Sequence, residues 1–181
     1  MNSNKIKKYQ QGFSMVELML VFAIILGLAA MVFYIYPKVQ DNQIASEELA
    51  NLTALQAGVK SLYQSKATYA SLTPQVLLNA NVVPNNMISG VDIVNRWRNV
   101  IVVSPTTLAG GTPNNGFSLT YAGVSQAACA KLAISLGATF DVINIAGVDA
   151  KTFGTLETDE SIAATQCALG GTNNTMILSS K

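Results

Sequence analysis

An uncharged run of 20 residues, 18–37, constrains this chain more than any other feature of its sequence. A helix of that length rises about 30 Å, which matches the thickness of the hydrocarbon core of a bilayer. Lys5, Lys7 and Lys8 precede the run, and positively charged flanks stay on the cytoplasmic side of a membrane. The sequence therefore predicts one membrane-spanning helix, with its N-terminus in the cytoplasm and the rest of the chain translocated.

A cleaved secretory signal shares this plan of a basic start followed by an apolar run. The run is, however, longer than the roughly 7–15 apolar residues of such signals. No Ala-x-Ala cleavage site follows residues 34–37 before the polar sequence begins. An uncleaved anchor, or one that is cut at its front, fits the sequence better.

Composition excludes several classes of function. Histidine is absent, which removes the Ser-His-Asp and Cys-His catalytic arrangements and every His-ligated metal site. The chain has 11 Lys and Arg against 10 Asp and Glu, so it offers no basic surface for many contacts to a nucleic-acid backbone. We expect no catalytic residues, no metal, no cofactor and no direct nucleic-acid site.

Glu17 stands at the edge of the apolar run. A carboxylate that faces lipid is costly at depth and less so near the headgroups. Physical chemistry alone leaves two interpretations open. Either Glu17 ends the hydrophobic segment at the membrane surface, or it meets a cationic partner on another chain.

Residues 12–17, Gly-Phe-Ser-Met-Val-Glu, together with the apolar run resemble the processing site of type IV prepilins and related pseudopilins. In that family a prepilin peptidase of the inner membrane cuts after the glycine and methylates the new N-terminus. The resemblance implies a leader at 1–12, cleavage between Gly12 and Phe13, and N-methylation of Phe13. It also implies that Glu17 neutralises the new ammonium group of a neighbouring subunit, a pairing that is worth most in an apolar surround.

The helix is expected to continue beyond the membrane, with a transmembrane and assembly half at 13–37 and an amphipathic half at 38–66. Ala23 and Gly27 offer a small face for helix packing. Pro37 removes a backbone donor, so the helix should kink or melt locally there. In the second half, apolar residues recur at three- and four-residue steps opposite polar ones. The apolar positions are Ala45, Leu49, Leu52, Leu55, Val59, Leu62 and Tyr63, and the polar ones are Asp41, Glu47, Glu48, Gln56 and Lys60.

Residues 67–181 are predicted to form an α+β head, with a sheet laid on the long helix. Runs typical of strands occur at 100–103, 117–121, 140–145 and 175–178. Short helices are expected at 75–79, 126–136 and 158–168, with Thr73, Ser125 and Thr158 as their caps.

Cys129 and Cys167 fall in the last two of these helices and would face an oxidising compartment after translocation. We expect them to form a disulfide across 37 intervening residues, and two buried free thiols are the alternative.

The segment 117–137 resembles the C-terminal region of type IVb pilins, in which a strand, a Gly-hydrophobic-Ser/Thr-Gln turn and a helix with the first cysteine follow one another. With the N-terminal motif, the resemblance covers essentially the whole chain. It implies the type IV pilin fold, an α+β protein whose long N-terminal helix packs against an antiparallel sheet. The 12-residue leader is longer than is usual in type IVa pilins. Phenylalanine at the first mature position, here Phe13, is in contrast typical of type IVa pilins.

This resemblance implies a non-enzymatic pilus subunit that polymerises into an extracellular filament for adhesion, aggregation, motility or DNA transfer. The implied partners are copies of the chain itself, the prepilin peptidase and methyltransferase, an inner-membrane assembly platform and, indirectly, an assembly ATPase. Before assembly the subunit would lie in the inner membrane with its head in the periplasm. Two alternatives are a pseudopilin of a type II-like secretion system and a membrane-anchored periplasmic binding domain that never assembles.

Two further patterns have simpler interpretations. Arg96-Trp97-Arg98 could stack on single-stranded nucleic acid, but two arginines in a nearly neutral chain are too few, and Trp97 is expected to pack against the head. Glu157, Asp159 and Glu160 lack the spaced oxygen ligands of a calcium loop, so we expect a solvated start of a helix.

Overall fold

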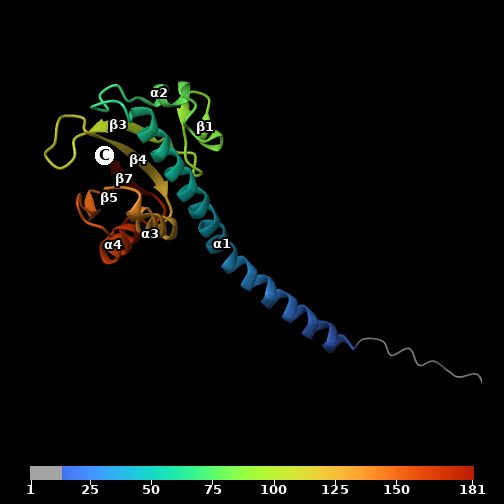
Figure 1. Ribbon diagram of the computed structural model, residues 1–181. Coiled ribbons are helices and arrows are strands. Elements are labelled where there is room, and N and C mark those ends of the chain that lie inside the picture. The colour runs from blue at the N-terminus through green and yellow to red at the C-terminus, as the bar shows by residue number, and fades with distance from the viewer. Residues whose placement is uncertain (1–13) are drawn as a thin grey trace, which may run out of the picture. The chain divides into compact units, whose positions relative to one another are not determined.

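The computed structural model describes residues 14–181 (Figure 1). The chain divides after Val39 into two compact units, which are described separately. Helix α1 (Met15–Tyr63) belongs to both. Its helical assignment continues through Pro37, so the local melting expected at that proline does not occur.

The N-terminal unit consists of the first part of α1. Between Met15 and Ile35 its large apolar side chains are exposed, and they include Leu18, Phe22, Leu26 and Phe33. Within the described residues, this helix is long and apolar enough to cross a membrane, and no part of its most apolar window is buried.

The second half of α1 forms the spine of the unit Gln40–Lys181. The predicted apolar stripe lies in the core, with Leu52, Leu55 and Val59 fully buried and Leu49 and Leu62 half-buried. Two of the residues expected on the polar face, Glu48 and Gln56, are buried as well, so that expectation was wrong for them. The side chain of Gln56 can be buried at low cost because its Nε2 donates hydrogen bonds to the carbonyl oxygen of Thr139 (3.1 Å) and to Ser180 Oγ (3.3 Å).

A five-stranded antiparallel sheet, in the order β3-β4-β7-β5-β6, packs beside the second half of α1 (Figure 1). Its strands are β3 (Val102–Thr106), β4 (Gly116–Val124), β5 (Val142–Ile145), β6 (Val148–Lys151) and β7 (Asn174–Ser180). The last strand in sequence, β7, inserts between β4 and β5, so the C-terminal segment completes the sheet. Leu119 and Tyr121 of β4 and Met176 and Leu178 of β7 alternate inward and are fully buried. The predicted α+β fold is confirmed.

The four strands that the sequence predicts are present with shifted bounds, whereas β6 and the small pair β1 (Ile88–Ser89) and β2 (Asp92–Ile93) were missed. The helices of the head are α2 (Pro74–Asn79), α3 (Gln126–Ser135) and α4 (Glu160–Gly170), and the 3₁₀ turns are η1 (Asn85–Met87) and η2 (Leu136–Ala138).

The caps of these helices agree only in part with the sequence. Thr73 caps α2 as predicted, since its side chain accepts from the backbone N–H of Val76. Ser125 occupies the cap position of α3 but makes no side-chain capping bond. At α4 the expected cap Thr158 was wrong, because Asp159 Oδ1 accepts from Ile162 N (3.0 Å). Thr158 instead donates to the carbonyl oxygen of Ala133 (3.1 Å), which ties this loop to α3.

Candidate functional site: the assembly segment, the disulfide and a polar cluster

The residues predicted for processing, Gly12 and Phe13, lie outside the described part of the chain. Glu17 stands in the first turn of α1, where a carboxylate is favourable beside the unpaired N–H groups of a helix start. Ala23 is exposed, and a Cβ built on Gly27 would meet no atom within 4 Å. Ala23 and Gly27 are therefore open to another helix, as the proposed packing face requires.

The two cysteines form the predicted disulfide. Cys129 of α3 and Cys167 of α4 have Cα atoms 5.8 Å apart, and both residues are fully buried. The bond fixes the two helices to each other. In the view of Figure 1, both helices lie below β5 and β7. The bond thereby closes a covalent loop that contains η2, β5 and β6.

A buried lysine, which sequence reasoning did not single out, stabilises the turn η2 that follows α3. Lys151 on β6 donates from Nζ to the carbonyl oxygens of Gly137 and Phe140, the latter at 2.9 Å. The last carbonyl groups of a helix lack partners within the helix, and a cation placed there satisfies them. Lys151 thus caps η2 and joins it to strand β6 of the sheet.

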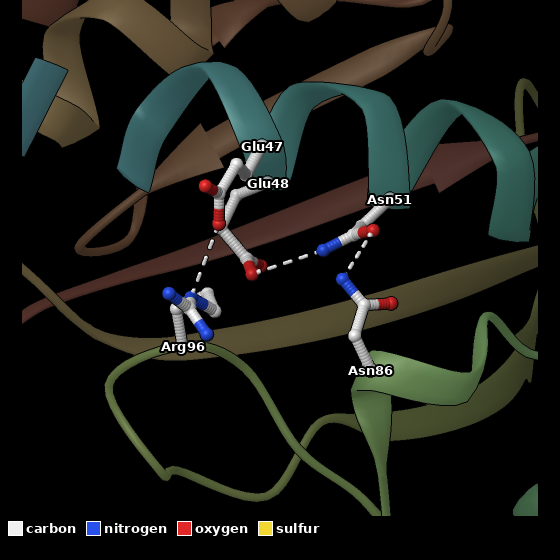
Figure 2. Close-up of polar contacts among 5 residues, drawn as sticks. All are labelled: Glu47, Glu48, Asn51, Asn86 and Arg96. Carbon is white, nitrogen blue, oxygen red and sulfur yellow. Dashed lines mark hydrogen bonds and ion pairs between the residues drawn. The ribbon is translucent and has the colours of Figure 1, made fainter. Parts of the chain in front are cut away.

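A cluster of polar side chains joins α1 to the segment that carries η1 and the loop after β2 (Figure 2). Asn51 Nδ2 donates to Glu48 Oε1 (3.2 Å), and Asn86 Nδ2 donates to Asn51 Oδ1 (3.0 Å). One residue before Glu48, the exposed Glu47 pairs with Arg96 through Oε2 and Nε at 3.3 Å. Polar contacts therefore hold this segment against the long helix from two points.

Glu48 is the buried acid of the cluster. Its side chain is fully buried, and its Oε2 atom has no hydrogen-bond partner among the described residues. Burial raises the pKa of Glu48 from 4.5 to about 7, while Asn51 and then Arg96 act in the lowering direction and Glu47 in the raising one. Near neutral pH, Glu48 therefore exists as a mixture of the acid and the carboxylate.

No local signal in the sequence marked this cluster. Successive residues of a helix are turned by about 100°, so two neighbours can both face solvent, as Thr53 and Ala54 do. Adjacent glutamates therefore do not by themselves indicate that one of them is buried.

Within residues 14–181, no group of three or more His, Cys, Asp and Glu side chains is placed to hold a metal ion. Asp159 is engaged as the cap of α4, and Glu157 and Glu160 beside it are exposed. Trp97 packs against the head as expected, edge-on to Tyr121 with ring centroids 6.2 Å apart.

Comparison with known protein families gives two matches that together span most of the chain. Residues 7–33 match the prokaryotic N-terminal methylation motif, and residues 42–181 match the family described as PilS N terminal.

Curated relatives extend these matches. The chain is 27% identical over 134 residues to the major structural subunit of the bundle-forming pilus of Escherichia coli O127:H6, covering 72% of this chain and 68% of that one. It is 25% identical over 165 residues to the toxin coregulated pilin of Vibrio cholerae serotype O1, covering 88% and 74%.

Two solved structures share the fold. The type IV b pilin from Salmonella typhi aligns with a TM-score of 0.58 at 23% identity, over 74% of this chain and 97% of that one. TcpA, a type IV pilin from Vibrio cholerae El Tor, aligns with a TM-score of 0.59 at 17% identity, over 77% and 99%.

The long helix, the antiparallel sheet closed by a disulfide-linked C-terminal region and the methylation motif define a type IV pilin, a structural subunit and not an enzyme. The chain belongs to the PilS family and is a type IVb pilin. Such a subunit begins as a membrane prepilin and ends in a pilus.

Proposed function

We propose that the chain is cut between Gly12 and Phe13, N-methylated at Phe13, and polymerised through segment 13–37 into an extracellular filament. The methylation motif at residues 7–33, followed by a helix whose apolar side chains are exposed, carries this proposal. Such a surface has to be covered, by lipid before assembly and by the helices of other copies afterwards.

In this proposal residues 1–12 are the leader, 38–66 the amphipathic half of the helix and 67–181 the head. Glu17 pairs with the methylated ammonium group of Phe13 on a neighbouring subunit, which couples cleavage to assembly. The partners are other copies of the chain, the peptidase and methyltransferase, the assembly platform and, through it, the assembly ATPase. The names of the two curated relatives, a major pilus subunit and a pilin, support the role of an abundant filament component.

The decisive experiment is an intact-mass measurement on filaments sheared from the cell surface. We expect a chain that begins at Phe13, carries one added methyl group, lacks two hydrogens because of the disulfide, and dominates the sample. A chain that still begins at Met1 would remove the pilin mechanism. As a companion test, Gly12→Leu should block cleavage, because a side chain then occupies the position next to the cut.

The same sheared filaments can be used to test the biological role of the pilus, whether adhesion, aggregation, motility or DNA transfer. A pseudopilin would instead form a short periplasmic assembly. Processed protein found strictly in the periplasm, with none in the sheared fraction, would favour that alternative over a surface pilus.

A further inference from the structure

The loop between β2 and β3 carries two arginines and is held by hydrogen bonds of its own. Asn95 N donates to the carbonyl oxygen of Asn99, and Arg98 N donates to that of Asn95, both at 2.9 Å. The buried Asn95 side chain accepts from Asn99 N (2.9 Å) and donates to the carbonyl oxygen of Ala122 in β4 (2.7 Å). The loop is therefore fixed internally and tied to the sheet.

Arg98 occupies a backbone conformation that does not favour arginine. Its φ is 62°, in the left-handed region, where residues other than Gly and Asn cost about 1 kcal/mol or more. The neighbouring Trp97 points into the head, where it packs against Tyr121. The backbone of the loop therefore does not account for an arginine at position 98.

The two arginines line one side of an open cavity of about 300 Å³ between this loop and the η1–β1 segment. Its lining consists of Asn86, Ser89, Val94, Asn95, Arg96 and Arg98. Arg96 pairs with Glu47 through its Nε atom, which leaves its two terminal NH2 groups outside this ion pair. Within residues 14–181, the side chains of Arg98 and Ser89 make no described hydrogen bond or ion pair, and Asn86 Oδ1 accepts none.

We propose that this cavity binds the carboxylate-bearing ring of an acidic sugar. Planar guanidinium groups bind a carboxylate through paired, charge-assisted hydrogen bonds, which are stronger than neutral ones. Asn86 Oδ1 can accept from a sugar hydroxyl, Ser89 Oγ can donate to or accept from one, and Val94 offers an apolar contact for the C–H face of the ring. Arginines alone would suit any anion, whereas the neutral groups beside them favour an anion that also carries hydroxyls. The site lies in the head and does not depend on polymerisation.

The test is a calorimetric and NMR titration of the full-length chain in detergent micelles at low ionic strength. The probes are glucuronate, acetate, which has the charge without the ring, and glucose, which has the ring without the charge. We expect saturable binding of glucuronate, with amide shifts that are largest in residues 86–98 and in the residues bonded to them, Glu47, Asn99 and Ala122. Binding of acetate should be about tenfold weaker, and glucose should not bind.

Arg98→Gly is the informative variant, because glycine suits the left-handed backbone and the head should fold at least as well. It is expected to weaken glucuronate binding about tenfold or more, and Arg98→Lys should give an intermediate loss, since the charge remains but the planar fork is lost. The matched control Lys66→Ala removes an exposed cation outside the cavity and should leave binding unchanged. Unchanged binding by Arg98→Gly, equal affinity for acetate and glucuronate, or largest shifts in residues away from the cavity and its bonded neighbours would overturn the assignment.

Discussion

Asn51 donates a hydrogen bond from Nδ2 to Oε1 of Glu48, three residues earlier on α1, at 3.2 Å (Figure 2). The same amide accepts from Asn86 through Oδ1, so the contact between the long helix and the η1 segment contains a buried acid as well as apolar packing. The helix therefore has an ionisable contact with the head.

The buried acid predicts a pH-dependent stability. Burial raises the pKa of Glu48 to about 7, so the folded state holds its proton more tightly than the unfolded state does. The stability gained from this proton is complete below about pH 4.5 and is lost as the pH rises through about 7. Glu48→Gln retains the shape of the neutral acid, so we expect a small effect at pH 5 and a gain of roughly 1–3 kcal/mol in the free energy of unfolding at pH 8.

The measurement is urea unfolding of the full-length chain in micelles, followed by the fluorescence of Trp97, the chain's one tryptophan. Glu47→Gln is the matched control, because Glu47 is exposed in an ion pair of the kind that contributes at most about 1 kcal/mol. A gain from Glu48→Gln that is equal at pH 5 and pH 8 would contradict the assignment of this titration to Glu48.

The disulfide should contribute a large share of the stability of the head. Cys129 and Cys167 are 38 residues apart in sequence, and closing a loop of that size restricts the unfolded chain by about 4 kcal/mol. We expect the double variant Cys129→Ala/Cys167→Ala to lose up to that amount in the free energy of unfolding. Dithiothreitol should destabilise the wild type similarly and leave the variant unaffected. Stability that is insensitive to the reductant in both proteins would show that the bridge contributes little.

Gly58 marks a close approach of α1 to the segment after α2. A Cβ at this position would lie 2.9 Å from the carbonyl oxygen of Val82 and 3.0 Å from its Cβ. Alanine normally stabilises a helix by about 1 kcal/mol over glycine, but here the clash should outweigh that gain. We expect Gly58→Ala to cost roughly 1–3 kcal/mol in urea unfolding. The same substitution at Gly27, which has no neighbour within 4 Å, should leave the head unchanged; equal stability of both variants would mean that Val82 yields readily.

Periodicity and local signals were sufficient for the long helix, its buried stripe and four of the strands. Strand β4 alternates buried and less buried residues over most of its length, and such a pattern is visible without tertiary information. Strands β1 and β2 contain two residues each, which is too short for any period to register. Strand β6 is four residues long and has two exposed residues followed by two buried ones, so its identity depends on pairing with β5.

The burial of Glu48 shows a different limit of sequence reasoning. Which flank of an amphipathic helix is covered depends on segments far away in the chain, in this case η1 and the loop of Arg96. The pairing of the cysteines was predictable because the chain has two of them and the head was expected in an oxidising compartment. Lys151 had no local signal, because its role comes from carbonyl groups of another element that the fold brings beside it.

Glu17 gives the sharpest test of assembly. In the proposed mechanism its carboxylate neutralises an ammonium group of a neighbouring subunit inside an apolar bundle of helices, and removing one partner of such a pair leaves a buried charge uncompensated. Glu17→Gln should therefore insert into the membrane and be cleaved normally, yet enter sheared filaments about tenfold less or worse. Glu47→Gln, which changes an exposed carboxylate on the same helix, is the control and should assemble normally. The readout is the ratio of processed subunit in the sheared fraction to that in the membrane fraction, and wild-type ratios for Glu17→Gln would exclude the charge-pair mechanism.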